Sequence, residues 1–148
     1  MNPTNDQYYY GVNLIWNSET RGTLSSPRIP SKIEVPIPPE FPRTIKERWT
    51  PEHLFIAAIS SSLMSAFLLF ADTSKLKFIS FESNAIGKIE KVDGRVVVTE
   101  IILKPKLTIP STQTETKARR AVKISEKALV IANSVKTKII LEPFITVQ

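Results

Sequence analysis

The strongest constraint on the fold is a run of eighteen uncharged residues, 54–71, which reads LFIAAISSSLMSAFLLFA. The run follows Thr50, Pro51 and Glu52 closely. These three residues respectively cap a helix, suit its first position and complement its positive end. The sequence therefore predicts a helix without a charged face, which must be buried in protein or in lipid.

Several properties of this helix favour a protein core over a membrane. A transmembrane helix needs about twenty apolar residues, whereas this run is shorter and contains serines at positions 60, 61, 62 and 65. Neither flank carries an aromatic belt or a strong asymmetry of basic residues. We therefore expect no membrane insertion. A helix that is apolar all round needs more cover than one small sheet supplies, so we expect a second copy of the chain on its other side.

The composition limits the possible chemistry. The chain has 148 residues, of which 42% are hydrophobic and 23% charged, and this is typical of one folded domain over residues 1–148. It contains no cysteine, so disulfides, thiolate catalysis and cysteine metal sites are excluded. His53 is the single histidine and cannot build a histidine metal site. We expect no metal and no cofactor. The polar N-terminus, MNPTNDQ, is no signal peptide, which favours a cytoplasmic location.

The net charge of +6 is compatible with an anionic partner. However, the basic residues are spread along the chain, and the longest run is Arg119-Arg120. A basic helix face with Arg120, Lys123 and Lys127 is the one candidate for nucleic-acid binding. We retain nucleic-acid binding as an alternative function but do not expect it, because no motif beyond charge supports it.

The remaining pattern predicts strands on both sides of the uncharged helix. Three strands are expected before it, at residues 8–16, 21–24 and 32–35, followed by a proline-rich connector at 36–42. After it, a strand at 76–90 with a possible bulge at Gly87 leads through the hairpin signal Asp93-Gly94 into a strand at 95–103. Residues 105–110 are expected to leave the sheet, and a last strand is expected at 138–147. The fold class is therefore α+β.

A second helix is predicted at residues 112–135, and it is amphipathic. Its small residues allow a close neighbour, for which the uncharged helix is the obvious candidate. The predicted buried stripe consists of Ala118, Ala121, Val122, Ser125, Ala128, Leu129 and Ala132.

The serine cluster at residues 60–62 is the first candidate for catalysis, with His53 as a conceivable base. On a helix, His53 and Ser60 would share a face but lie about 10 Å apart along the axis. That separation is too large for direct proton transfer. We expect the serines to bond to the preceding helical turn and His53 to be a surface or capping residue. A hydrolase-like enzyme therefore remains an alternative with poor geometry.

The sequence also resembles a known family, the osmotically inducible and organic-hydroperoxide-resistance (OsmC/Ohr) proteins. The resemblance rests first on WTPEHLFIAAISSSLM at residues 49–64. Trp16 followed by Arg21-Gly22 is similar to the family's first hairpin. The prolines and Glu40-Phe41 of the connector are similar to the family's P-P-E-F segment, and ALVIANS at residues 128–134 is similar to a later family segment.

The resemblance implies both a fold and a reaction. The fold is an intertwined α+β homodimer in which antiparallel sheets enclose two long central helices. The reaction is peroxide reduction by two cysteines: the first becomes a sulfenic acid and the second resolves it to a disulfide. An arginine and a glutamate stabilise the first thiolate.

The family pattern identifies four positions in this chain. The arginine matches Arg21 and the glutamate matches Glu52, while the reactive cysteine falls on Ser62 and the resolving cysteine on Leu129. Serine cannot pass through sulfenic acid and disulfide, and leucine has no redox chemistry. We therefore expect loss of thiol peroxidase activity and a non-catalytic homodimer. Arg21, Glu52 and Ser62 would line a residual pocket for a small hydrophobic ligand, or would form a purely structural polar cluster.

Overall fold

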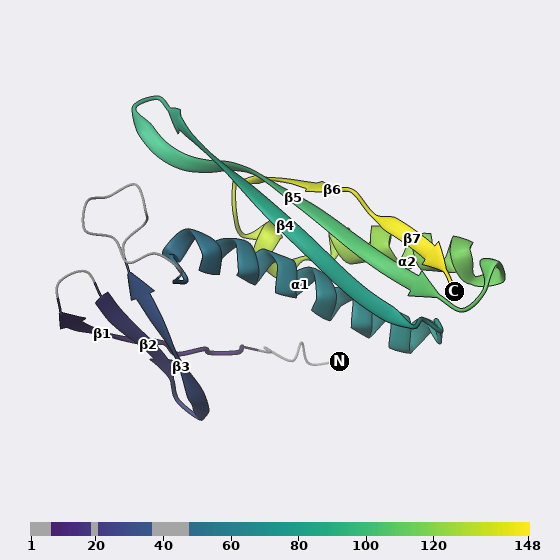
Figure 1. Cartoon of the computed structure of the whole chain (residues 1–148), viewed down its shortest axis with the longest axis horizontal. Coiled ribbons are helices and arrows are strands. Elements are labelled where there is room, and N and C mark those ends of the chain that lie inside the picture. Colours follow the sequence, from purple (N-terminus) through teal and green to yellow (C-terminus); the bar gives the residue numbers. More distant parts are fainter. Residues whose placement is uncertain (1–6, 19–20, 37–47) are drawn as a thin grey trace. The chain divides into compact units, whose positions relative to one another are not determined.

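The structure, a computed structural model, describes residues 7–18, 21–36 and 48–148. The chain forms two compact units, Met1–Leu54 and Phe55–Gln148, each of which is described by itself (Figure 1). The prediction of a single domain over residues 1–148 stays a prediction. Most of the predicted connector at 36–42 lies outside the described residues.

The first unit contains an antiparallel sheet with the order β1-β2-β3, formed by Asn13–Ser18, Arg21–Ser26 and Ile29–Pro36. The register aligns Leu14 with Leu24 and Ile33, and Trp16 with Gly22 and Val35. Because aligned residues share a face of a sheet, these six positions form one apolar face. The three strands were predicted, although β1 begins and ends later than expected.

The helix α1, Pro51–Ser74, extends three residues beyond its predicted end at Ala71. At its start, the Thr50 N–H donates to Nδ1 of His53 (3.2 Å), so His53 caps the helix as expected. At its end, Lys75 adopts a positive φ of 53°. The Leu76 N–H then reaches back to the Ala71 carbonyl (2.9 Å), which is a Schellman motif.

The two sides of α1 differ in burial. One side carries the fully or almost fully buried residues Ile59, Leu63, Phe67 and Ala71. The other side exposes apolar residues, including Met64, Leu68 and Leu69. By length and composition α1 could also cross a membrane, although this test is weak for a single helix with a side packed in a core. The sequence predicted that α1 is buried on all sides. Within a single chain one side is buried and the other is exposed.

The second unit contains a sheet built around a long hairpin. The strands β4, Ser80–Val92, and β5, Arg95–Ile109, pair antiparallel, and β6, Lys138–Leu141, and β7, Phe144–Val147, both pair with β5 in parallel. The expectation of antiparallel sheets therefore holds for β1–β3 and for the hairpin but not for β6 and β7. The chain passes through the helical segment after β5 before it reaches β6, and such a crossover lets β6 and β7 run in the same direction as β5. A direct hairpin would have made them antiparallel.

Proline 105 does not end β5, contrary to the prediction that residues 105–110 leave the sheet. The carbonyls of Leu103 and Ile109 accept from Glu142 and Gln148, so alternate residues of β5 face β6 and β7. By this alternation, Pro105 faces the gap between those two strands. Its missing N–H therefore removes no sheet hydrogen bond.

The hairpin turn and its bulge differ in how well the sequence predicted them. Asp93 and Gly94 both have positive φ (50° and 78°), as a type I′ turn requires. The bulge lies at Thr99, which is unpaired between Lys88↔Glu100 and Ile89↔Val98, and not at Gly87. Gly87 instead lies close to α1, because a Cβ there would lie 2.5 Å from Cδ1 of Ile56, which would have to move.

The predicted second helix is broken into three pieces: a 3-10 turn at Thr112–Thr114, α2 at Glu115–Lys127 and α3 at Val130–Asn133. The break lies at Leu129, whose extended backbone (φ −70°, ψ 92°) turns its side chain into the core. The predicted stripe is buried at Ala118, Ala121, Val122, Ser125 and Leu129, whereas Ala132 is half-buried and Ala128 is exposed.

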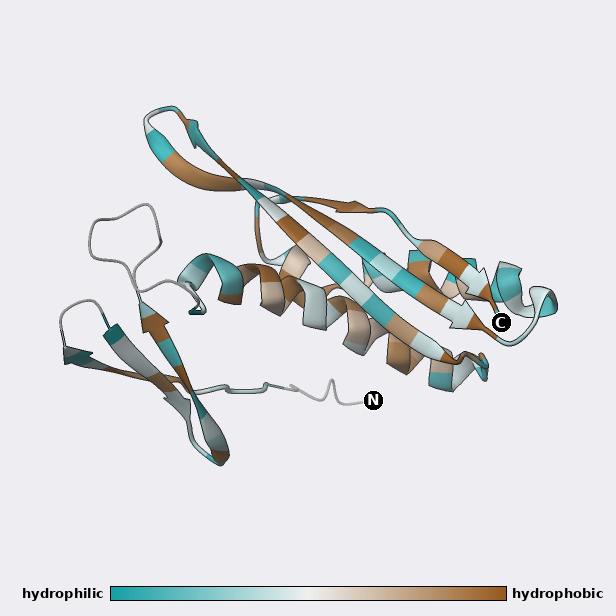
Figure 2. Cartoon of the chain, in the orientation of Figure 1, coloured by the Kyte–Doolittle hydropathy of each residue, from teal (hydrophilic) through white to brown (hydrophobic). Residues whose placement is uncertain are grey.

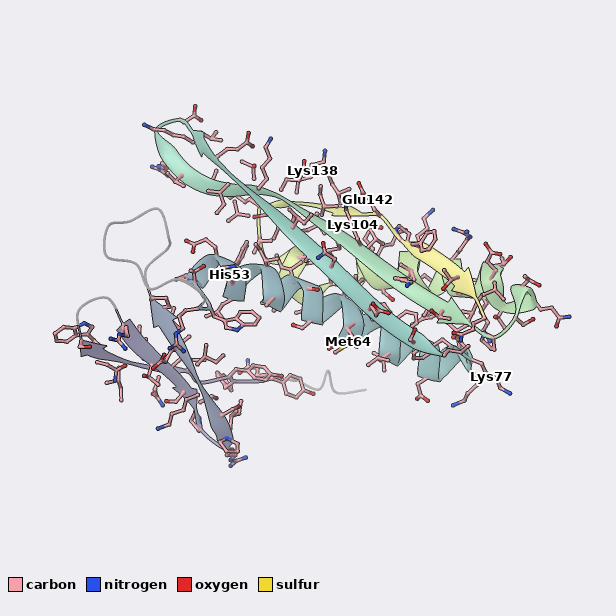
Figure 3. All side chains as sticks on the ribbon, in the orientation of Figure 1. His53, Met64, Lys77, Lys104, Lys138 and Glu142 are labelled. Atoms are coloured by element: carbon pink, nitrogen blue, oxygen red, sulfur yellow. The ribbon has the colours of Figure 1, made fainter. Side chains whose placement is uncertain are left out.

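The helices cover one face of the second sheet. Apolar residues alternate with polar ones along β4 and β5 (Figure 2), and the inward residues of β5 pack against both α1 and α2. Lys104, Lys138 and Glu142 lie on the face turned away from α1, whereas Met64 lies on the side of α1 turned away from the sheet (Figure 3). The α+β class is thereby confirmed.

Candidate ligand pocket between α1 and α2

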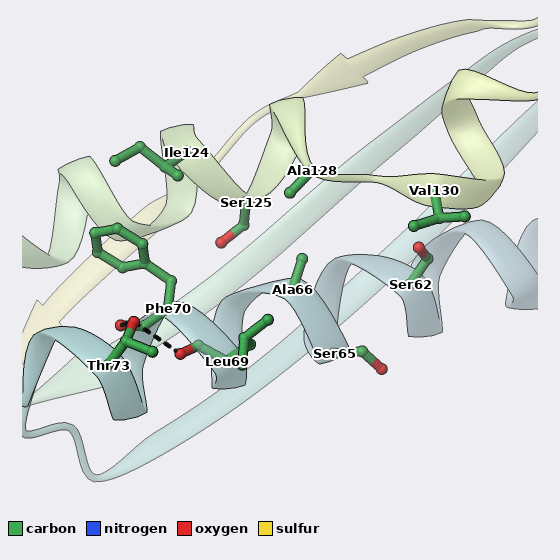
Figure 4. Close-up of a pocket in the computed structure, with 10 residues that line it drawn as sticks. All are labelled: Ser62, Ser65, Ala66, Leu69, Phe70, Thr73, Ile124, Ser125, Ala128 and Val130. Atoms are coloured by element: carbon green, nitrogen blue, oxygen red, sulfur yellow. Dashed lines mark hydrogen bonds between the residues drawn. The ribbon is translucent and has the colours of Figure 1, made fainter. Parts of the chain in front are cut away.

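A cavity of about 470 Å³ separates α1 from the segment that begins with α2. Figure 4 shows Ser62 and Ala66 of α1 turned toward Val130 and Ala128 on the opposite wall. The volume is within the range of small-molecule sites, about 300–1,000 Å³. The lining consists of Ser62, Ser65, Ala66, Leu69, Phe70, Thr73, Ile124, Ser125, Ala128 and Val130.

Hydroxyl groups are the polar side chains of this lining, which includes no charged residue. The hydroxyls of Ser65, Thr73 and Ser125 donate to carbonyls of the preceding helical turn, at 3.1, 3.1 and 2.6 Å. The back-bonding predicted for the serines at residues 60–62 is observed for Ser61. Within the described part of the chain Ser60 and Ser62 make no such bond, and Ser62 keeps its hydroxyl available to the cavity.

Leu129 lies beside this cavity but does not line it. Its neighbours Ala128 and Val130 are lining residues, while Leu129 itself packs with Ile59, Leu63 and other residues of the core. The structure thus brings the segment that contains Leu129 to the same cavity as Ser62. It gives the two positions different environments, one facing the cavity and one in the core.

Arg21 and Glu52 belong to the first unit. Arg21 is exposed at the start of β2, where it pairs with Ser18 and Pro36. Glu52 lies in the first turn of α1, and its Oε2 is buried without a hydrogen-bond partner among the described residues. A buried carboxylate oxygen without a partner is costly, so Glu52 is the one predicted site residue whose surroundings call for a further contact.

The predicted catalytic alternatives find little support in the local geometry. The ring Nδ1 of His53 lies 2.8 Å from Oγ1 of Thr50 and also accepts from the Thr50 N–H, so this nitrogen is occupied by capping. A serine nucleophile needs an adjacent base, and no titratable side chain lines the cavity with Ser62. Within residues 7–18, 21–36 and 48–148, no group of three His, Cys, Asp or Glu side chains could hold a metal ion.

Among the described residues, the side chains with a shifted pKa lie away from this cavity, at the bulge of the hairpin. The hydroxyl of Thr99 donates to the Glu90 carboxylate, and this hydrogen bond lowers the pKa of Glu90, with a further contribution from Lys88. In turn, the hydrogen bond to Glu90 (2.9 Å) raises the pKa of Lys88. Lys88 is exposed, Glu90 and Thr99 are half-buried, and none of the three lines the cavity with Ser62.

A second cavity, of about 560 Å³, lies under the far end of the hairpin. Its charged lining residue is Lys136. It contains none of the positions that the sequence singled out. Its other lining residues are Phe55, Val92, Val97, Val98, Thr99 and Thr137.

Sequence reasoning identified only part of the first cavity. It named Ser62 but not Ala66, Phe70 and Thr73. These three follow Ser62 at spacings of four, eight and eleven residues, which is the spacing of one helix face. That periodicity could have identified the α1 wall. The opposite wall, formed by Ile124, Ser125, Ala128 and Val130, depends on how α2 docks and on the break before α3.

Comparisons with known proteins agree on the fold. The sequence pattern of the family described as "OsmC-like protein" matches residues 45–143. An OsmC-like protein of unknown function from Vibrio cholerae has a similar structure, with a TM-score of 0.83 and 24% identity over 93% of this chain and 99% of that one. No curated protein sequence matches the chain.

Two structurally similar proteins carry functional names. The organic hydroperoxide resistance protein of Elizabethkingia anophelis has a TM-score of 0.72 and 18% identity, over 98% of this chain and 100% of that one. For OhrB, the organic hydroperoxide resistance protein of Bacillus subtilis, the values are 0.68 and 14%, over 93% and 98%. At these identities the similarity shows a shared fold.

Proposed function

Because this chain belongs to the OsmC-like family and yet contains no cysteine, we propose that it is a non-catalytic homodimer that binds a small hydrophobic ligand. The observation that carries the proposal is the Ser62 hydroxyl, which faces an apolar cavity and lacks a hydrogen bond among the described residues. One free hydroxyl in an apolar pocket can orient a ligand by a single hydrogen bond.

The loss of peroxidase chemistry follows from the two replaced positions. In the family reaction a thiolate accepts the peroxide oxygen and a second thiol forms a disulfide. Ser62 and Leu129 provide neither group. Consistent with this, Leu129 packs as an ordinary core residue with Ile59 and Leu63. This position now contributes to packing.

The proposed dimer is supported by apolar surface that one chain leaves exposed. The exposed side of α1 includes Met64, Leu68 and Leu69, and the last of these also lines the cavity. The apolar face of the first sheet is exposed at Leu14 and Trp16. A second copy that covers these surfaces would remove them from water, which is the main driving force for association. It would also close the side of the cavity formed by Leu69.

A cluster of Arg21, Glu52 and Ser62 at this pocket is part of the proposal. Its support is the resemblance to the family together with the unpartnered Oε2 of Glu52. A cytoplasmic location is also part of the proposal, and its support is membership of the OsmC-like family and the fold shared with an organic hydroperoxide resistance protein.

Peroxide consumption with a dithiol reductant tests the proposed loss of catalysis. The native protein should show no turnover of an organic hydroperoxide, and turnover would overturn the proposal. A Ser62→Cys, Leu129→Cys double variant should gain activity if Arg21 and Glu52 still surround position 62 in the dimer. A double variant that folds and forms the disulfide between positions 62 and 129, yet shows no activity, would contradict the predicted cluster.

Ligand binding is tested separately by calorimetry with decanol, an uncharged probe with one hydroxyl. Decanol should bind to the native protein and should be excluded by Ala128→Phe, which places a large side chain at the edge of the cavity. Thr116→Phe is the matched control, because Thr116 is exposed on α2 and does not line the cavity. Equal binding to both variants would place the ligand elsewhere.

A further inference from the structure

The charges on α2 are distributed unevenly around the helix. At about 100° per residue, Lys117, Arg120 and Lys127 lie on the same side as Ile124, while Glu115 and Glu126 lie on the opposite side. Glu115 is paired with Arg119 (2.7 Å). The four exposed cations Lys117, Arg120, Lys123 and Lys127 have no ion pair within the described part of the chain.

This cationic side of α2 borders the cavity described above. Ile124 is a lining residue, and Arg120 and Lys127 lie four residues before and three residues after it. Residues at these spacings are neighbours on a helix surface, with Cβ atoms about 5–6 Å apart. The cavity therefore has an uncharged, apolar interior and a cationic edge on its α2 side.

We propose that the ligand is an amphipathic anion, a single alkyl chain with a carboxylate head. The alkyl chain of the ligand occupies the apolar interior of the cavity, and its carboxylate lies at Arg120 and Lys117. This inference rests on the proposed function, since it assumes that the cavity binds a ligand. A nucleic acid could use the same cations but would leave the apolar interior unfilled.

The helix termini indicate the direction in which the alkyl chain of the ligand lies in the cavity. Lys127 is the last residue of α2, where the helix dipole is negative and partly offsets its charge for an anion. Arg120 and Lys117 lie further from that end, so they are the better partners for the carboxylate. Figure 4 shows Ile124 on the wall opposite Phe70, and Val130 on the wall opposite Ser62. The alkyl chain would then run from the Ile124 end toward Ser62.

Asp72 is the acid nearest in sequence to the α1 residues at the Ile124 end. Its carboxylate lies 3.6 Å from Nζ of Lys75, so the pair adds no net negative charge there. The α1 C-terminus also has a negative dipole end, equivalent to about half an elementary charge, against the two full positive charges of Arg120 and Lys117. The unpaired cations of α2 therefore dominate the local charge.

Three probes with the same alkyl chain test the charge preference: decanoate, decanol and decyltrimethylammonium, each below its aggregation concentration. Calorimetry should show decanoate binding about five- to tenfold more tightly than decanol, the effect expected of two partly exposed ion pairs. Decyltrimethylammonium should bind more weakly than decanol. The advantage of decanoate should shrink as salt is added.

Arg120→Glu should remove the advantage of decanoate and leave decanol binding unchanged. Lys91→Glu is the matched control, because it makes the same charge change at an exposed position of the hairpin that does not line the cavity. If Arg120→Glu does not fold, Lys117→Gln and Arg120→Gln provide a milder test, with a smaller but still selective loss for decanoate.

The outcomes separate the two proposals. Equal affinities for decanoate and decanol, or equal effects of Arg120→Glu and Lys91→Glu, would overturn the anionic ligand and leave the apolar pocket intact. If none of the three probes binds to the native protein, the ligand-binding function proposed above fails and this inference fails with it.

Discussion

The two sheets of this chain share an alternation of apolar and polar residues, but their apolar faces differ in burial. In the second unit, Ile101, Leu103 and Leu107 are 0% exposed because α1 and α2 pack on them. In the first unit, Leu14 and Trp16 are 66% and 72% exposed. The same sequence pattern therefore accompanies a buried core in one unit and an exposed apolar face in the other.

The difference follows from the helices that each unit has available to cover the apolar face of its sheet. The second unit contains two amphipathic or apolar helices that can cover its sheet, whereas the first unit ends at Leu54, within the first turns of α1. The described residues of the first unit include only this turn of helix, and an amphipathic sheet buries its apolar face against another element. We expect that element to come from the second copy of the chain.

The largest expected effect is on the covered side. Phe67 is fully buried, and its ring centroid lies 4.7 Å from that of Phe81 and 5.2 Å from that of Phe78. Phe67→Ala should lower the free energy of unfolding by about 3–5 kcal/mol, measured by denaturant titration. Leu68→Ala, at the next and partly exposed position, should cost much less. Equal losses would show that the two sides of α1 are not different in burial.

A close contact on the same side gives the next largest effect. Gly87→Ala places a Cβ 2.5 Å from Cδ1 of Ile56, and overpacking of this kind costs about 1–3 kcal/mol. Ile56→Val removes the offending Cδ1, so the double variant should be less destabilised than the sum of the single variants. Strict additivity in a double-mutant cycle would rule out the contact.

The uncovered side is tested through association. Leu14 and Ile15 are similarly exposed, 66% and 63%, but lie on opposite faces of the first sheet. Leu14→Asp should weaken the dimer at least about tenfold, roughly 1.4 kcal/mol, because a carboxylate would be buried in the proposed interface. Ile15→Asp should have little effect. Sedimentation across a concentration series checks this, and an unchanged dimer in Leu14→Asp would contradict our interpretation of this face.

The smallest effect concerns the hairpin bulge. Thr99→Val removes the hydrogen bond that lowers the pKa of Glu90, so that pKa should rise toward its ordinary value in an NMR titration. Because the folded pKa is lowered, the native bond stabilises the fold above the ordinary carboxyl pKa. The contribution is lost as the pH falls through the lowered value. A Glu90 pKa that does not change in the variant would mean that Lys88 alone controls it.

Local signals in the sequence predicted several elements of the fold correctly. The uncharged run after Thr50 produced α1, and Asp93-Gly94 produced a turn with two positive φ angles. Capping by His53 also followed from its place in the first turn. Each of these depends on interactions between residues close in the chain, which a single sequence contains.

The errors arose where distant segments decide the outcome. Pro105 stays in the sheet because it faces the gap between β6 and β7, and the second helix breaks where Leu129 enters the core. The bulge lies at Thr99 and not at Gly87, whose close neighbour is Ile56 of α1. None of these partners is near in sequence.

The sequence by itself determined the family, the absence of thiol chemistry and the position of Ser62 on an uncharged helix. Residue identities decide these properties, so no coordinates are needed. Tertiary structure alone decided that Ser62 faces a cavity while Leu129 is in the core, and that the cations of α2 border that cavity. The reason is physical: a pocket is the space left between elements, and its shape and charge depend on how they pack.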